Sequence, residues 1–143
     1  MEVNRPRILV ADDHARMRNC IVCVLSAEFD VVGAVCDGDE LVTAALELEP
    51  DVIVSDISMP KLSGIDAKKC LQALGADIPF VFVSANPYFT ENVMRNLGVC
   101  VPKADLVSNL NAEVRATLSE LAICRQSRHL ACGTIPDYKD LPT

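Results

Sequence analysis

The stretch Asp51-Val52-Ile53-Val54-Ser55-Asp56-Ile57-Ser58-Met59-Pro60 joins a short apolar run to a single acidic residue and then to a loop. The apolar run has the length of a buried strand, and the proline, followed by Gly64, is typical of a loop. This stretch therefore predicts a strand that presents the Asp56 carboxylate at its C-terminal end.

The same pattern recurs along the chain, where short apolar runs alternate with segments of helical periodicity. We expect strands at 7–11, 31–35, 52–55, 78–85 and 99–101. We expect helices at 14–28, 40–48, 64–74 and 90–97, and a last helix capped by Asp105. Pro50 and Gly75 are placed to end the second and third of these helices.

Five strands in strict alternation with helices indicate an α/β fold, a doubly wound parallel sheet with five helices on its two faces. Right-handed crossovers leave few topologies, and the flavodoxin-like strand order 2-1-3-4-5 fits five strands. We expect one domain over residues 6–122. The periodicity fades near residue 125, so residues 123–143 are expected to form a helix extension and a loose tail or linker.

The composition narrows the class of protein. The chain has 143 residues, half of them apolar, and a net charge of −7. An acidic chain is a poor candidate for direct nucleic-acid binding or for an anionic membrane surface. No apolar run approaches the ~20 residues of a membrane span, and the N-terminus lacks the apolar centre of a signal peptide. We expect a cytoplasmic protein.

The seven cysteines are scattered without the spacing of a disulfide framework, which indicates reduced thiols. Cys20 and Cys23 have the spacing of a redox motif or half a zinc site. They lie within an apolar helical run, and no second pair follows at zinc-finger distance, so helix packing is the favoured interpretation over a redox or metal role.

Acidic residues follow the first and third strands, which flank the point where the strand order reverses. Ligands of open α/β sheets bind at this point, so Asp12, Asp13 and Asp56 are expected to meet there. Carboxylates that close repel one another, and a cation removes the repulsion. Oxygen ligands on loops suit Mg²⁺, and the carbonyl of Ser58 could supply a further oxygen.

Two more polar residues belong to the same edge of the sheet. Ser84 ends the fourth strand, and Lys103 follows the fifth. Each residue alone has an ordinary explanation as a helix cap, a turn acid or a surface lysine. Together, a hydroxyl, an ammonium and a cation suit a phosphoryl group, whose transfer needs positioning and neutralisation of charge. Asp56 is the acid best centred to act as the nucleophile.

With these motifs the sequence resembles the receiver domain of bacterial two-component response regulators over about residues 6–122. The resemblance rests on Val10-Ala11-Asp12-Asp13-His14, on Asp56-Ile57-Ser58-Met59-Pro60-x-x-x-Gly64, on Val83-Ser84-Ala85 and on Lys103. The acidic pair followed by histidine, and Lys103-Ala104-Asp105, are similar to the subgroup that usually carries a C-terminal helix-turn-helix.

The resemblance implies a role for each matching residue. Asp56 would accept a phosphoryl group from a phosphohistidine of a sensor histidine kinase. Asp13 and Asp56, with the carbonyl of Ser58, would hold Mg²⁺, and Asp12 would act mostly through a water. Lys103 would pair with the phosphoryl group and Ser84 would shift toward it. These roles are those of a phosphoacceptor that switches an unknown downstream protein, and not of a metabolic enzyme.

Two departures from the family pattern affect the output. The family usually places an aromatic switch residue three positions before the lysine, where this chain has Cys100. A small thiol cannot swing as a ring does, so we expect the signal to leave through the fourth strand and helix. The sequence also leaves open whether the receiver acts alone, as a homodimer, or within a longer protein.

The predicted first helix is apolar on nearly all sides. Val22 and Cys23 are expected to lie off its core-facing stripe, where an exposed apolar patch would mark a contact site. This helix is where the family docks its kinase. Crowding of the helix by the C-terminal part of the chain is an alternative explanation.

Two other functions compete with that of a phosphorylated receiver. A phosphatase with an aspartate nucleophile would carry a second acid two residues later, where this chain has Ser58. A pseudo-receiver would be a protein-interaction module that is never phosphorylated, with redox sensing through its cysteines. The complete set of Asp13, Asp56, Ser84 and Lys103 argues against it.

Overall fold

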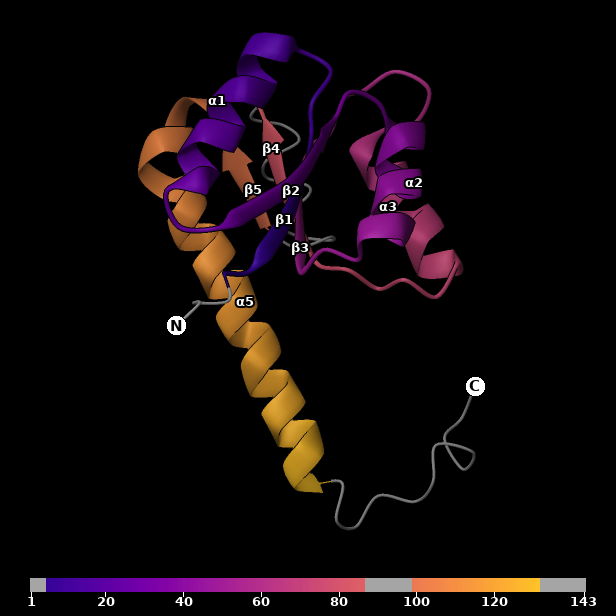
Figure 1. Ribbon diagram of the computed structural model, residues 1–143, viewed down its shortest axis with the longest axis vertical. Helices are drawn as coiled ribbons and strands as arrows, with labels where there is room; N and C mark the ends of the chain where they lie inside the picture. Colours follow the sequence, from indigo (N-terminus) through magenta and orange to yellow (C-terminus); the bar gives the residue numbers. More distant parts are fainter. Residues whose placement is uncertain (1–4, 87–98, 132–143) are drawn as a thin grey trace.

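The computed structural model describes residues 5–86 and 99–131 of the chain. A five-stranded sheet lies between two groups of helices, with α1 (Ala15–Ser26) and α5 (Leu106–Ala131) on one face and α2 (Gly38–Leu48) and α3 (Gly64–Ala73) on the other (Figure 1). The helix expected at 90–97 lies outside the described residues.

The strands are β1 (Arg7–Ala11), β2 (Asp30–Val35), β3 (Val52–Asp56), β4 (Phe80–Ser84) and β5 (Val99–Pro102). They form one parallel sheet in the order β2-β1-β3-β4-β5, which confirms the flavodoxin-like α/β fold expected from the sequence. β4 is shorter than the expected 78–85. The strand starts after Pro79, which has no N–H to donate to a neighbouring strand. The Pro79 carbonyl still accepts a hydrogen bond from the Ile53 N–H at 3.0 Å.

Alternate residues of the central strands supply two separate cores. Ile8, Val10, Val52 and Val54 face α1 and α5, whereas Leu9 and Ile53 belong to the core beneath α2 and α3. Because both faces of β3 are covered, all five of its residues are buried, including Asp56. A near-continuous apolar strand is what a doubly covered parallel sheet requires.

The starts of α2 and α3 follow the chemistry expected of an N-cap. Asp37 caps α2, since its Oδ1 accepts a hydrogen bond from the Glu40 N–H at 2.8 Å, and Ser63 caps α3 through the Asp66 N–H at 3.1 Å. Gly75, with φ of +84°, follows the end of α3 as expected. The 3-10 turn Lys103–Asp105 leads directly into α5, so Asp105, which was expected to cap that helix, is instead the last residue of the turn.

The packing of α5 against α1 corrects one expectation. The Asn111 side chain donates a hydrogen bond to the Val24 carbonyl at 2.9 Å, and Arg115 forms an ion pair with Glu28. α1 is therefore covered over a wider arc than a single stripe. Val22, expected off the core, is half-buried and packs against the core instead, whereas Cys23 is exposed as expected.

Within the described ranges, none of the helices combines the length and the apolar character that a membrane crossing needs.

Candidate functional site

The site is built from the C-terminal ends of four neighbouring strands. Asp12 directly follows β1, Asp56 ends β3, Ser84 ends β4, and Lys103 directly follows β5. The strand register aligns these ends, because Ala11 pairs with Ser55 and Asp56 pairs with Val83. The expected convergence of the acidic residues with Lys103 is therefore present in the structure.

Lys103 joins two of the carboxylates. Its Nζ donates a hydrogen bond to Asp56 Oδ2 at 3.0 Å and lies 3.3 Å from Asp12 Oδ2. Asp12 is completely buried and Asp56 is only 5% exposed. An ammonium in this position is the counter-charge that allows two buried carboxylates to share one edge of a sheet.

The environment shifts the pKa of both partners. Burial raises the pKa of Asp56 above its ordinary value, although the hydrogen bond and charge of Lys103 oppose this and the nearby Asp12 adds to it. Burial lowers the pKa of Lys103, but the hydrogen bond and charges of Asp56 and Asp12 outweigh it, so the net pKa of Lys103 is raised. Lys103 therefore stays charged at neutral pH.

The backbone beside Asp56 is fixed by close packing. The Gly64 N–H donates to the Ile57 carbonyl at 2.8 Å, and the Ser55 hydroxyl donates to the Asp56 carbonyl at 2.8 Å. A Cβ on Gly64 would lie 2.2 Å from the Asp56 carbonyl oxygen, so no larger residue fits without moving β3 or α3. This contact explains why glycine stands eight positions after the acid.

The loop after β3 also supports the carboxylate. The Ser58 backbone N–H approaches Asp56 Oδ1 at 3.3 Å, while the Ser58 side chain is exposed. The two Asp56 carboxylate oxygens therefore accept hydrogen bonds from different donors, Oδ2 from Lys103 and Oδ1 from the backbone of this loop. Ser84 lies at the same edge, and its hydroxyl accepts a hydrogen bond from the Asn86 N–H at 3.0 Å.

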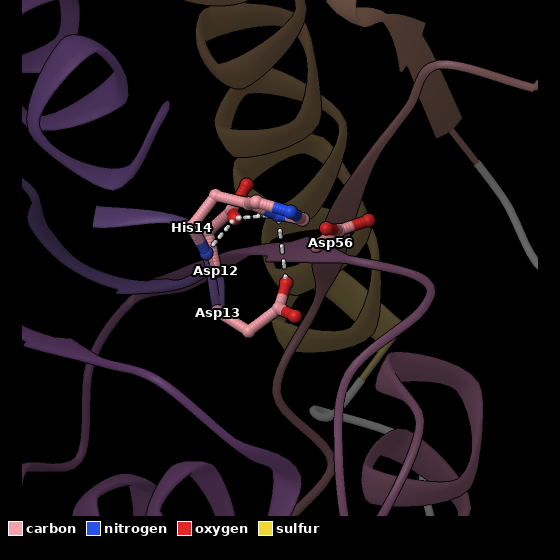
Figure 2. Close-up of side chains that lie close together, drawn as sticks. All are labelled: Asp12, Asp13, His14 and Asp56. Carbon is pink, nitrogen blue, oxygen red and sulfur yellow. Dashed lines mark hydrogen bonds and ion pairs between the residues drawn. The ribbon is translucent and has the colours of Figure 1, made fainter. Parts of the chain in front are cut away.

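The oxygens of the acidic cluster are suited to a cation. Ligand atoms of Asp12, Asp13, His14 and Asp56 all lie within 4.8 Å of one another (Figure 2). Asp12 Oδ2 and Asp13 Oδ1 are buried atoms, and each lies against one nitrogen, the Lys103 ammonium at 3.3 Å and the His14 ring at 3.1 Å. One ammonium and one ring nitrogen leave room for a cation to compensate the three carboxylates further. The donor set fits Mg²⁺, which prefers oxygen ligands.

His14 is the one member of this cluster to which the sequence analysis gave no role. Its Nδ1 lies 3.1 Å from Asp13 Oδ1 and 3.7 Å from Asp12 Oδ1. The only signal in the sequence was its position next to the acidic pair. That signal is weak, because the direction of the ring depends on how the chain turns into α1.

Two cysteines have environments that bear on the competing functions. Cys100 is 4% exposed and packs in the core beneath α2 and α3. The exposed Cys36 thiol donates a hydrogen bond to Glu40 at 3.3 Å, and this bond is the main reason why the pKa of the thiol is raised. A thiol with a raised pKa is a poor nucleophile, which disfavours Cys36 as a redox sensor.

Comparison with known proteins places this geometry in a family. The model of the response regulator receiver domain matches residues 8–103. The DNA-binding response regulator MtrA of Mycolicibacterium smegmatis is 33% identical over 124 residues, which cover 82% of this chain and 53% of that protein. A protein-glutamate methylesterase/protein-glutamine glutaminase of Caldanaerobacter subterraneus is 43% identical over 81 residues, which cover 55% of this chain and 22% of that protein.

Solved structures of response regulator domains have the same fold as this chain. The response regulator domain of Thermotoga maritima CheB has a TM-score of 0.70 and 30% identity, and the match covers 80% of this chain and 97% of that one. This chain spans between about a fifth and about half of the curated relatives cited above. Since the family match extends over most of the chain and includes all four strand ends of the site, the chain belongs to the response regulator receiver domains of two-component signal transduction.

Proposed function

We propose that Asp56 is the phosphoacceptor of this receiver and takes a phosphoryl group from the phosphohistidine of a sensor histidine kinase in the presence of Mg²⁺. The observation that carries the proposal is the position of the Asp56 carboxylate. It lies at the end of a fully buried strand, 3.0 Å from the Lys103 ammonium and beside the buried carboxylate oxygens of Asp12 and Asp13.

In the transfer, an Asp56 carboxylate oxygen bonds to phosphorus as the bond from phosphorus to the donor nitrogen breaks, and the nitrogen keeps the electron pair. Lys103, which stays charged, is placed to move from Asp56 Oδ2 onto a phosphoryl oxygen. The Ser84 hydroxyl, which accepts a hydrogen bond from the Asn86 backbone N–H, would turn toward a second phosphoryl oxygen. Positioning and neutralisation of oxygen charge are what phosphoryl transfer requires.

Asp12, Asp13 and Asp56 would hold Mg²⁺, with the Ser58 carbonyl as a further oxygen ligand. The bound cation would neutralise developing charge on the phosphoryl oxygens. Lys103 and Mg²⁺ would then oppose the repulsion between the carboxylates and the incoming phosphoryl group. Asp12 and Asp13 follow β1, whereas Asp56 ends β3, so the sheet itself sets the separation between these two groups of ligands.

We infer that the partners are a cytoplasmic sensor histidine kinase and a downstream protein or domain that reads the phosphorylated surface. A self-association switched by phosphorylation is compatible with this function. The net charge of −7 disfavours direct nucleic-acid binding by these 143 residues. The methylesterase and DNA-binding descriptions belong to relatives that are much longer than this chain.

The test is incubation with a small-molecule phosphodonor and Mg²⁺, followed by intact-protein mass spectrometry. We expect the mass to rise by one phosphoryl group, with no gain in Asp56→Asn or in the presence of a chelator. Asp66→Asn is the matched control, because Asp66 is exposed on α3 and should leave phosphorylation unchanged.

Two results would support the competing functions. Rapid multiple turnover of an added phosphate ester would indicate a phosphatase. A mass that never changes, while the folded protein still binds Mg²⁺, would indicate an interaction module that is not phosphorylated.

A further inference from the structure

His14 occupies a position in which its side chain is not needed for local structure. It is the N-cap residue of α1, and its carbonyl accepts the first hydrogen bond of the helix from the Arg18 N–H at 2.8 Å. N-cap residues usually satisfy a free helical N–H through a side-chain oxygen. The His14 side chain makes no such bond, and its ring instead projects toward the acidic cluster (Figure 2).

The backbone of His14 is held in place by the loop that follows β1. Asp12 Oδ1 accepts a hydrogen bond from the His14 N–H at 2.8 Å, so the completely buried Asp12 holds the start of the His14 side chain. The ring itself is 73% exposed. It therefore forms the solvent side of the cluster, and a cation could enter without displacement of a core residue.

The contact between His14 and Asp13 is the critical one. Nδ1 and Asp13 Oδ1 are 3.1 Å apart, within the distance of an ion pair. Two neighbouring ligands of an octahedral cation, each about 2.1 Å from it, are separated by about 3.0 Å without pointing at each other. The observed separation matches that of a pair of adjacent ligands.

The rest of the cluster is compatible with one ion. Opposite ligands of such a cation would be about 4.2 Å apart, and the four ligand atoms lie within 4.8 Å of one another. The fully buried Asp12, whose Oδ2 lies 3.3 Å from Lys103 Nζ, belongs to the same cluster. An imidazole adds a donor atom without adding negative charge to a site that already holds three carboxylates.

We propose that His14 is a nitrogen ligand of the cation in this site and that it gives the site a preference for Mn²⁺ over Mg²⁺. Imidazole nitrogen binds a transition-metal ion such as Mn²⁺ more strongly than it binds Mg²⁺, which prefers oxygen and retains its waters. The proposal deepens the proposed function, on which it rests, because it concerns the cation of the same site.

Pulsed electron paramagnetic resonance of Mn²⁺ bound to the whole chain tests this directly, since a coordinated imidazole gives a nitrogen coupling. We expect the coupling in the wild type, a change of its pattern on ¹⁵N-histidine labelling, and its loss in His14→Ser. Serine is chosen because it is a good N-cap residue, so α1 should still form. His129→Ala removes the only other histidine and should leave the coupling intact.

Affinity gives a second measurement that does not depend on phosphorylation. In His14→Ser, Mn²⁺ binding should weaken by at least about tenfold, the size expected when a metal site loses one of its supporting groups. Mg²⁺ binding should change much less. The two cations should therefore be discriminated less in the variant than in the wild type.

The outcomes separate the two proposals. Mn²⁺ that binds without a histidine coupling overturns the role of His14 and leaves the phosphoacceptor proposal standing. A histidine coupling in a protein that never gains a phosphoryl group overturns the phosphoacceptor and retains the ligand. A wild-type chain that binds neither Mn²⁺ nor Mg²⁺ overturns both.

Discussion

Lys103 and Asp56 are 47 residues apart in sequence, and their side chains are joined by a 3.0 Å hydrogen bond across the edge of the sheet. β4 lies between the strands that carry them. Lys103, which follows β5, therefore reaches past β4 to the Asp56 carboxylate at the end of β3. It also lies 3.3 Å from Asp12, so one ammonium serves two buried acids.

Replacement of this ammonium should increase the dependence of the fold on a divalent cation. In Lys103→Met the carboxylates lose their internal counter-charge, so we expect lower thermal stability without metal and a larger gain in melting temperature on addition of Mg²⁺ than in the wild type. Lys61→Met is the control, because Lys61 is exposed and forms an ion pair with Asp37 at 3.5 Å, away from the acidic cluster. An equal gain in the wild type and Lys103→Met would show that Lys103 does not compensate the cluster.

The raised pKa of Asp56 predicts a particular dependence of stability on pH. The folded state holds the Asp56 proton more tightly than the unfolded state, so the associated stability is fully present below the ordinary carboxyl pKa. It is lost as the pH rises through the higher folded value. Ionised Asp56 is thus a net cost at neutral pH. We expect Asp56→Asn to melt at a higher temperature than the wild type at pH 7.

The difference in melting temperature between Asp56→Asn and the wild type should shrink as the pH is lowered toward about 4, near the ordinary carboxyl pKa. Thermal melts in metal-free buffer from pH 4 to pH 8 measure this difference. Asp66→Asn should show no comparable trend. An Asp56→Asn variant less stable than the wild type at pH 7 would mean that the bond to Lys103 outweighs burial.

The contact between Gly64 and the Asp56 carbonyl makes a steric prediction. In Gly64→Ala the new methyl group would lie 2.2 Å from that carbonyl oxygen, so β3 or α3 must shift. We expect a loss of about 1–3 kcal/mol in the free energy of unfolding, as for other overpacked sites. We also expect slower phosphorylation by a small-molecule donor, because the carboxylate moves with its backbone.

Chemical denaturation and the mass assay measure these two effects. Gly75→Asn is a matched control, since Gly75 has open space around it and asparagine tolerates its left-handed backbone. It should phosphorylate at the wild-type rate. Normal stability in Gly64→Ala would contradict the close approach.

The exposed face of α1 is the predicted kinase contact, and Cys23 now tests it better than Val22. Val22 packs against the core, so Val22→Glu should destabilise the fold. Slower phosphotransfer in that variant could then come from misfolding as well as from a lost kinase contact. Cys23→Glu places a charge on the exposed face. We expect it to slow phosphotransfer from the cognate kinase several-fold and to leave phosphorylation by a small-molecule donor unchanged. Equal slowing with both donors would indicate a defect in the site itself.

The sequence predicted those features that depend on strand ends. Asp12, Asp56 and Lys103 could be placed together because parallel strands bring their carboxyl ends to one edge, and apolar runs reveal where each strand ends. The pair of cores was equally predictable, since residues such as Val54 and Ile53 alternate between the faces of a doubly covered strand.

Features that depend on packing between distant elements could not be predicted in this way. Val22 was misplaced because α5 packs against α1 and widens its buried face, which no local periodicity reveals. His14 received no role because its ring direction follows from the turn into α1. Gly64 could be read as a loop residue, but its contact with the Asp56 carbonyl appears only in three dimensions.

The hydrogen bonding of β3 has a mechanical consequence. β3 is flanked by β1 and β4, and pairing on both sides holds its residues in register. A charge added at its last residue cannot be relieved by sliding or bending of the strand, because the ladders on both sides would have to break. The sheet therefore forms a rigid base beneath Asp56. Any movement caused by the added charge is expected in the loops beyond the strand ends. If Asp56 is phosphorylated as proposed, we expect movement at the rim of the sheet that carries the C-terminal strand ends and none at the opposite rim.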